Sequence, residues 1–217
     1  MASLDLLCKK TWGRNVIPVK SQPEPSNFSQ LVRNRGLKFL ENNSPPNSWK
    51  GKEFWRKALP ELCNAYSRIC AYSAQWVPPV VGASTVDHFV PKKHAPQLAY
   101  EWSNFRLACS LLNSRKRDFQ DVLDPFKIGN SWFILDFPSL QVKPGSVITL
   151  TESNQVVSTI NRLNLNDEIC ITFRIDWLKY FCLGDISFNH LEEKAPFIAY
   201  ELKRQNLVGK IISIMGF

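Results

Sequence analysis

Hydrophobic residues recur at helical spacing in two segments of the first half of the chain. The first is "FSQLVRNRGLKFLEN", residues 28–42, where apolar positions return every three or four residues although Gly36 weakens the pattern. The second is "PELCNAYSRICAY", residues 60–72, because Pro60 suits a first helical turn and the apolar residues fall on one face. Both segments therefore predict helices.

The second half of the chain combines strand patterns with helix patterns. Alternating, aromatic or β-branched runs predict strands in "SWFILDF", "SVITLTE" and "QVVSTI", which are residues 131–137, 146–152 and 155–160. The segments "NDEICITFRIDWLKYFCL" and "SFNHLEEKAPFIAYELKRQNL" predict two helices, and the second is expected to be interrupted near Pro196. The predicted fold class is α+β.

Changes in composition divide the chain into three segments. Residues 1–48 are rich in Pro, Ser and Asn and predict an N-terminal arm with one short helix. Residues 49–125 contain a helix and the residues that could carry chemistry. Residues 126–217 supply strands and helices that would support this unit or bind a partner.

The composition is typical of a folded protein inside the cell. Hydrophobic residues make up 44% of the chain and aromatic residues 12%, which argues against overall disorder. No run of apolar residues is long enough for a membrane span, and the first residues lack a secretory layout. Six cysteines without disulfide-like spacing indicate a reducing compartment. We expect a cytoplasmic protein with no membrane association.

Positive charge is concentrated in the first half of the chain. Residues 1–118 contain 18 Lys and Arg against 8 Asp and Glu, a balance of +10, whereas residues 119–217 contain 9 against 11, a balance of −2. This asymmetry favours a polyanion, most commonly nucleic acid, as a partner of the first half. Ordinary solvated surface charge is the alternative interpretation.

The candidate chemistry begins in "STVDHFVPKK", residues 84–93, which places Asp87 beside His88. This pair is either a strand end with two polar caps or one edge of a metal-dependent site. Asn104 follows His88 by sixteen residues, and Asn113 follows Asn104 by nine. A short strand "FRLAC" followed by a helix "SLLNSRKRD" would return Asn113 to the end of the Asp-His strand.

These residue types suit hydrolysis of a phosphodiester. The reaction needs a hard divalent cation held by oxygen ligands, which Asp87 can supply, and a base near neutral pH, which His88 can supply. Neighbours in a strand point to opposite faces, so the two can share one site only where the strand ends and the chain turns. Pro91 and the loop after it allow such a turn.

The pattern "VDHFVPK…EWSNFRLAC…NSRKRD" resembles the HNH nuclease motif, the ββα-metal finger, in its His-Asn-Asn form. The resemblance implies that Asp87 and Asn113 hold one Mg²⁺ or Mn²⁺ ion and that His88 is the general base. It also implies that Asn104 braces the loop that orients His88. If the motif is not real, these residues are unrelated caps and turns.

The sequence departs from this family at its structural zinc site. Many members have two Cys-x-x-Cys pairs, whereas here Cys70 is paired with Ser73 and Cys109 with Leu112. Serine is a poor zinc ligand and leucine is none, so we expect no structural zinc, with Cys70 and Cys109 packed as small apolar residues. Aromatic residues around the motif would support it in place of zinc, mainly as core: Tyr72, Trp76, Phe89, Tyr100 and Trp102.

Basic residues flank the motif on both sides. Arg115, Lys116 and Arg117 follow Asn113 closely, and about two of these three could face a phosphate backbone because consecutive residues fan around a helix. Lys92 and Lys93 could contact the other side of the substrate. A solvated basic surface is the alternative interpretation of each.

The segments around the motif are similar in layout to HNH proteins of bacterial anti-phage systems, among them the PtuB-like group of Septu and some retrons. This resemblance implies a nuclease effector of a defence system with an SMC-like ATPase partner. DNA is the favoured substrate and RNA the alternative. The competing hypotheses are a catalytically silent nucleic-acid-binding subunit and a regulatory subunit of a defence complex.

Overall fold

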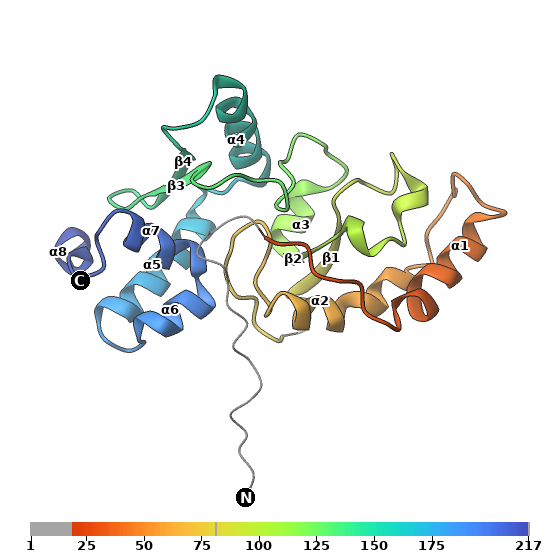
Figure 1. Cartoon of the computed structure of the whole chain (residues 1–217), viewed down its shortest axis with the longest axis horizontal. Helices are drawn as coiled ribbons and strands as arrows, with labels where there is room; N and C mark the ends of the chain where they lie inside the picture. Colours follow the sequence, from red (N-terminus) through yellow and green to blue (C-terminus); the bar gives the residue numbers. More distant parts are fainter. Residues whose placement is uncertain (1–18, 81, 217) are drawn as a thin grey trace, which may run out of the picture.

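The computed structural model describes residues 19–80 and 82–216. In these residues the chain forms an α+β structure with eight α-helices and two small antiparallel sheets (Figure 1). The α+β class of the prediction is therefore confirmed. Of the predicted N-terminal arm, residues 1–18 lie outside the described residues.

The first predicted helix is present, as a π-helical turn at Ser29–Arg33 followed by α1 (Asn34–Leu40). Gly36 is required inside this helix because a Cβ atom there would lie 2.0 Å from ring carbons of Tyr100. A short 3₁₀ helix (Phe54–Ala58) leads into α2 (Leu59–Ala65), where Pro60 occupies the first turn as expected.

Helix α2 ends at Ala65, seven residues before the end of the predicted helix, so this part of the prediction is wrong. Ser67 and Arg68 have φ values of 49° and 60°, which turn the chain out of the helix. The amide of Ala71 then donates to the Leu107 carbonyl at 2.8 Å. Residues 70–72 are therefore bonded to the central hairpin instead of continuing α2.

The central hairpin has the predicted order of strand, long connection, strand and helix. Strand β1 (Ser84–His88) pairs antiparallel with β2 (Phe105–Cys109), and α3 (Ser110–Lys116) follows β2 directly. The register places His88 opposite Phe105. Two 3₁₀ turns, Pro96–Leu98 and Trp102–Asn104, lie in the connection between the strands.

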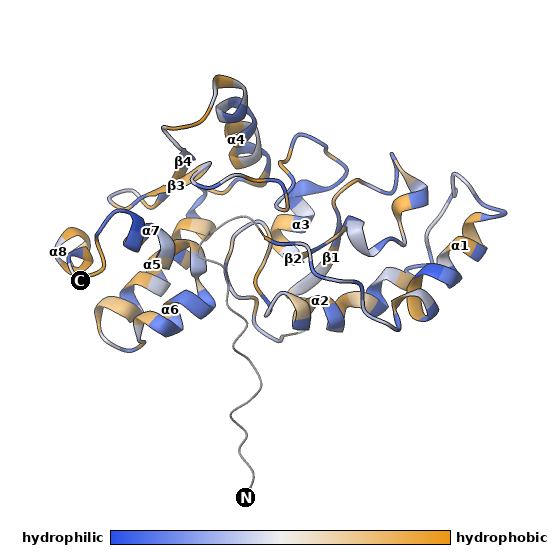
Figure 2. Ribbon diagram, in the orientation of Figure 1, coloured by the Kyte–Doolittle hydropathy of each residue, from blue (hydrophilic) through white to orange (hydrophobic). Residues whose placement is uncertain are grey.

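The C-terminal part differs from the prediction at two of its three strands. Strand β3 (Phe133–Asp136) is present and pairs with β4 (Gln141–Pro144), which the sequence pattern did not indicate. The predicted strands at 146–152 and 155–160 are instead a turn and α4 (Leu150–Leu163), a helix that carries both hydrophobic and hydrophilic residues (Figure 2).

The reason for this error is a capping box at the start of α4. The Thr149 hydroxyl accepts from the Glu152 amide at 3.2 Å, and the Glu152 carboxylate accepts from the Thr149 amide at 2.7 Å. These bonds satisfy two amides at the helix N-terminus. The alternating β-branched residues that suggested strands therefore lie on a helix.

The remaining helices agree with the prediction, except that the structure contains one helix that the sequence did not predict. They are α5 (Glu168–Cys182), α6 (Phe188–Lys194), α7 (Pro196–Arg204) and α8 (Ile211–Met215). The expected interruption near Pro196 is confirmed, because α6 ends at Lys194 and Pro196 begins α7. Helix α8 was not predicted.

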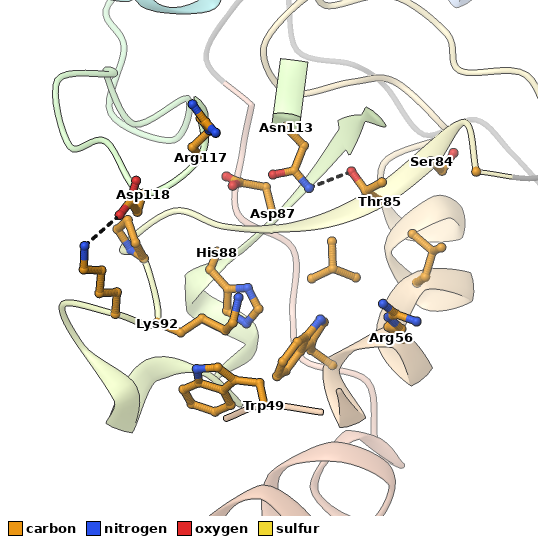
Figure 3. A pocket seen from close by; sticks show the side chains of 16 residues that line it. Trp49, Arg56, Ser84, Thr85, Asp87, His88, Lys92, Asn113, Arg117 and Asp118 are labelled. Carbon is orange, nitrogen blue, oxygen red and sulfur yellow. Dashed lines mark hydrogen bonds and ion pairs between the residues drawn. The ribbon is translucent and has the colours of Figure 1, made fainter. Parts of the chain in front are cut away.

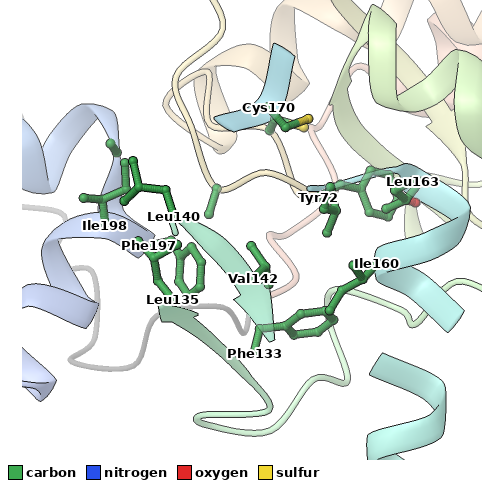
Figure 4. Close-up of a cluster of buried hydrophobic side chains, with 14 of the residues drawn as sticks. Tyr72, Phe133, Leu135, Leu140, Val142, Ile160, Leu163, Cys170, Phe197 and Ile198 are labelled. Carbon is green, nitrogen blue, oxygen red and sulfur yellow. The ribbon is translucent and has the colours of Figure 1, made fainter. Parts of the chain in front are cut away.

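Two hydrophobic clusters hold these elements together. The N-terminal cluster contains Phe28, Trp55, Leu62, Tyr100 and Phe105 among others, and it packs α1 and α2 against the hairpin. The C-terminal cluster joins β3, β4, α4, α5 and α7 to residues 70–77, and Figure 4 shows side chains of this cluster from both strands, together with Tyr72 and residues of α4, α5 and α7. Within the residues described, no helix has the length and apolar character that crossing a membrane requires.

Candidate active site

A pocket of about 800 Å³ lies where β1, α3 and the segment before α2 meet, and we call it the central pocket (Figure 3). Asp87, His88 and Asn113 all line it, so the hairpin and helix bring these three predicted residues together. The full lining is Trp49, Trp55, Arg56, Leu59, Gly82, Ser84, Thr85, Val86, Asp87, His88, Pro91, Lys92, Lys93, Asn113, Arg117 and Asp118.

The Asp87 carboxylate is buried and has a donor on each oxygen. The Tyr72 hydroxyl donates to Oδ2 at 2.5 Å, and the Lys116 ammonium donates to Oδ1 at 3.1 Å. Burial and the charge of Asp87 raise the pKa of Tyr72 well above its ordinary value, so its hydroxyl remains a donor. These two contacts fix the rotamer of the Asp87 side chain, and among the described residues no further donor bonds its oxygens.

Lys116 does not face solvent, which differs from the expectation that it contacts a phosphate backbone. Its side chain is 1% exposed, and its ammonium also donates to the carbonyls of His88 and Phe89 at 2.9 and 3.0 Å. A buried ammonium requires such a set of oxygen acceptors. Lys116 therefore belongs to the support of Asp87 and not to the surface.

His88 lies at the end of β1 between aromatic rings. The rings of Trp55 and Phe105 contact it edge-on, with centroid distances of 4.9 and 5.3 Å. Its Nε2 lies 2.9 Å from the Ala99 carbonyl, and because a carbonyl can only accept, Nε2 carries the proton and Nδ1 keeps its lone pair.

The same environment keeps the imidazole neutral. Burial lowers the pKa of His88 to about 3, and the positive charges of Lys92 and Lys116 act in the same direction. The neutral imidazole can therefore accept a proton at Nδ1 in neutral solution. A base of such low pKa takes up a proton less readily than an exposed imidazole, so the position of Nδ1, and not the pKa, supports a general-base role.

Asn104 is buried outside the lining of the central pocket, and its side chain bonds the connection between β1 and β2. Its Oδ1 accepts from the Val90 amide at 2.8 Å, and its Nδ2 donates to the carbonyls of Val90 and Leu98 at 3.0 and 3.1 Å. Leu98 is adjacent to Ala99, whose carbonyl accepts from His88. The Asn104 side chain thus holds the two ends of this connection together. The carbonyl that fixes the His88 ring belongs to the same connection.

Asn113 projects from α3 toward β1. Its Nδ2 donates to the Thr85 hydroxyl at 3.0 Å, which turns Oδ1 toward Asp87 (Figure 3). Among the residues that the structure describes, no donor bonds this Oδ1. A carboxylate and a free amide oxygen on one wall of an open pocket are ligands that a hard divalent cation prefers, so these residues fit Mg²⁺ or Mn²⁺.

The other predicted nucleic-acid-binding residues divide into two groups. Lys92, Lys93 and Arg117 line the central pocket. The Lys92 ammonium lies over the rings of Trp55 and Trp49, at 5.0 and 5.9 Å from their centroids. Arg115 instead pairs with Asp167 at the start of α5 and donates to the Leu163 carbonyl, which places it away from the pocket.

The cysteines of the predicted zinc-site remnant lie next to each other. The Cys109 amide donates to the Cys70 sulfur at 3.3 Å. Cys70 and Leu112 are buried in the C-terminal cluster, while Cys109 is partly exposed. Within the described residues, no three His, Cys, Asp or Glu side chains group closely enough to hold a metal ion.

Sequence reasoning missed the support of Asp87 and part of the pocket wall. Tyr72 was expected in the core and Lys116 on the surface, and each donates to Asp87. Trp55 and Arg56 also line the pocket, although no motif includes them. The interval of three residues between Asn113 and Lys116 was the available signal, because that spacing places both on one side of a helix.

No protein-family model matches the chain, and no curated protein matches it in sequence.

Proposed function

We propose that this chain is a metal-dependent endonuclease of the HNH type that hydrolyses phosphodiester bonds in nucleic acid, with DNA as the favoured substrate. The observation that carries the proposal is the shared pocket of Asp87, His88 and Asn113, in which the bond of Nε2 to the Ala99 carbonyl leaves the lone pair of His88 on Nδ1. A module that only binds nucleic acid has no need of this arrangement.

The residues of the chain take separate roles in the proposed reaction. Asp87 and Asn113 would hold the cation, which when bound neutralises charge on the scissile phosphate and on the leaving oxygen. His88 accepts a proton from the attacking water at Nδ1, while the Ala99 carbonyl keeps the ring in one orientation. Water adds across the P–O bond, which leaves a phosphomonoester on one product and a hydroxyl on the other.

The charges around the pocket support a polyanionic substrate. Arg56, Lys92, Lys93 and Arg117 line it, and phosphate contacts of this kind supply much of the affinity of nucleic-acid-binding proteins. The resemblance of the flanking segments extends the proposal to an effector of anti-phage defence with an SMC-like ATPase partner.

A cleavage assay with matched histidine variants tests the proposal. Purified protein is incubated with plasmid, single-stranded DNA and RNA, in Mg²⁺ or Mn²⁺ and in EDTA. Loss of a general base lowers rates on the order of 10²–10⁴-fold, so His88→Ala should abolish visible cleavage. The control is His190→Ala, which removes a histidine of α6 outside the pocket.

Two outcomes would overturn the proposal. Equal cleavage by the two histidine variants would remove His88 from the mechanism. Binding without cleavage of any substrate in either metal would favour a silent nucleic-acid-binding or regulatory subunit.

A further inference from the structure

The central pocket is positively charged before any ion enters it. Arg56, Lys92, Lys93 and Arg117 face two carboxylates, Asp87 and Asp118. Asp118 already accepts from the Lys93 ammonium at 3.2 Å. Asp87 is therefore the one carboxylate in the lining that faces the candidate metal position beside Asn113.

The negative charge of Asp87 is itself compensated from behind the pocket wall. The Lys116 ammonium lies 3.1 Å from Oδ1, with the two side chains 1% and 2% exposed. Water cannot screen a pair that is buried this completely. To a cation in the pocket, Asp87 and Lys116 together present almost no net charge.

A divalent cation beside Asp87 and Asn113 would then sit among uncompensated positive charges. The Asn113 oxygen is a neutral ligand, and Lys92 and Arg117 line the same pocket. Like charges on the wall of a pocket disfavour the entry of a further cation. Among the described residues the lining offers no further carboxylate beside Asp87 and Asp118. A phosphodiester has one negative charge and two unesterified oxygens, so it could supply the missing charge.

We infer that Lys116 makes ion binding depend on the substrate: the divalent cation binds weakly to the free protein and tightly only together with a nucleic-acid phosphate. This inference rests on the proposed function and concerns the order in which the same site fills. By linkage, the cation strengthens nucleic-acid binding by the same factor. The free protein in the cell would thus carry an incomplete active site until nucleic acid supplies the phosphate.

A Mn²⁺ titration that is monitored by electron paramagnetic resonance tests this inference without measuring activity. The full-length His88→Ala variant, which prevents cleavage, is titrated with Mn²⁺ alone, with an oligothymidylate, and with a methylphosphonate oligomer of the same length. We expect the phosphodiester to raise Mn²⁺ affinity at least about tenfold and the uncharged oligomer to change it by less than about twofold. Titration of each oligomer without protein corrects for Mn²⁺ bound to the oligomer itself.

Two further variants locate the effect. Asp87→Asn should remove the phosphodiester-dependent Mn²⁺ binding. Lys116→Met should raise the affinity for Mn²⁺ alone and reduce the phosphodiester effect, because the charge of Asp87 is then uncompensated. If circular dichroism shows that Lys116→Met does not fold, the comparison of the two oligomers on the parent variant still decides the question.

The outcomes separate this inference from the proposed function. Tight Mn²⁺ binding without nucleic acid, unchanged by the phosphodiester, would overturn the inference and leave the nuclease proposal standing. Absence of Mn²⁺ binding with and without the phosphodiester would overturn both.

Discussion

Asp87 and His88 are neighbours in sequence, yet their side chains lie in different kinds of surroundings. Asp87 accepts from a hydroxyl and an ammonium, whereas His88 lies between the rings of Trp55 and Phe105. The polar contacts suit a charged carboxylate, and the aromatic contacts suit a neutral imidazole. These surroundings agree with the proposed roles, in which Asp87 is an ion ligand and His88 accepts a proton.

The burial of His88 predicts a pH dependence of stability in metal-free buffer. Its pKa in the folded protein is about 3, lowered from an ordinary value of 6.5. Between these values the unfolded chain takes up a proton that the folded chain does not, so the free energy of unfolding falls as pH decreases. Above pH 6.5 His88 does not lower the free energy of unfolding. Below pH 6.5 this free energy falls by about 1.4 kcal/mol per pH unit on account of His88.

Urea unfolding in EDTA between about pH 7 and pH 5 measures this effect. The comparison is between the wild-type protein and His88→Gln, whose side chain does not titrate. The variant should lose less stability over this interval. The same pH dependence in both proteins would show that His88 is not held neutral by the fold.

Arg117 occupies a strained backbone position at the edge of the pocket. It ends α3 with φ of 52° and ψ of −128°, a conformation that favours glycine. We expect Arg117→Gly to be more stable than Arg117→Ala by about 1 kcal/mol, because only alanine keeps the strain. Both variants remove the guanidinium and should weaken nucleic-acid binding equally. Thermal unfolding should show different stabilities for the two variants, whereas a binding assay should show the same affinity. Equal stabilities would contradict backbone strain at residue 117.

At the scale of elements, the sequence correctly predicted the helices and strands whose sequence signals are local. The helix at 29–40, the hairpin with α3, and the break at Pro196 follow from periodicity, turn residues and motif spacing. The segment at 146–160 was mispredicted because the capping box of Thr149 and Glu152 favours a helix, although the segment is rich in β-branched residues. Strand β4 and the early end of α2 depend on pairing with distant residues, which a single sequence does not reveal.

The candidate site could be predicted only in part for the same reason. Asp87, His88 and Asn113 share the central pocket because Asp87 and His88 end β1 and Asn113 lies on α3, which directly follows the paired strand β2. The Tyr72 hydroxyl reaches Asp87 only because the chain leaves α2 after Ala65 and Ala71 bonds to β2. No feature near Tyr72 in the sequence indicates this contact.

The surroundings of Cys70 and Cys109 predict that purified protein contains no stoichiometric zinc. A structural zinc needs four ligands, and near these two sulfurs the remaining positions are Ser73 and the apolar, buried Leu112. Elemental analysis of protein purified without chelator should find far less than one zinc per chain. A Leu112→Cys, Ser73→Cys double variant restores four thiols and serves as the control that should take up zinc. One tightly held zinc in the wild-type protein would require ligands other than these.

At the scale of the whole molecule, the uneven charge of the chain coincides with the central pocket. Every residue that lines the pocket lies between Trp49 and Asp118, inside the half of the chain with a balance of +10. The C-terminal half supports this region from behind, for example through the pairing of Arg115 with Asp167. A polyanion should therefore meet the molecule on the pocket face.

This placement predicts how nucleic-acid binding depends on salt. Each cation that neutralises a duplex phosphate contributes about −0.9 to the slope of log affinity against log salt concentration. Arg56, Lys92, Lys93 and Arg117 line the pocket, so binding of duplex DNA in EDTA should show a slope of roughly −3 to −4. Arg56→Ala should reduce the magnitude of the slope by about 0.9. Lys179→Ala, which removes an exposed lysine of α5, should leave it unchanged. Equal reductions in both variants would mean that the polyanion binds diffusely over the surface and that the pocket face has no special part in recognition.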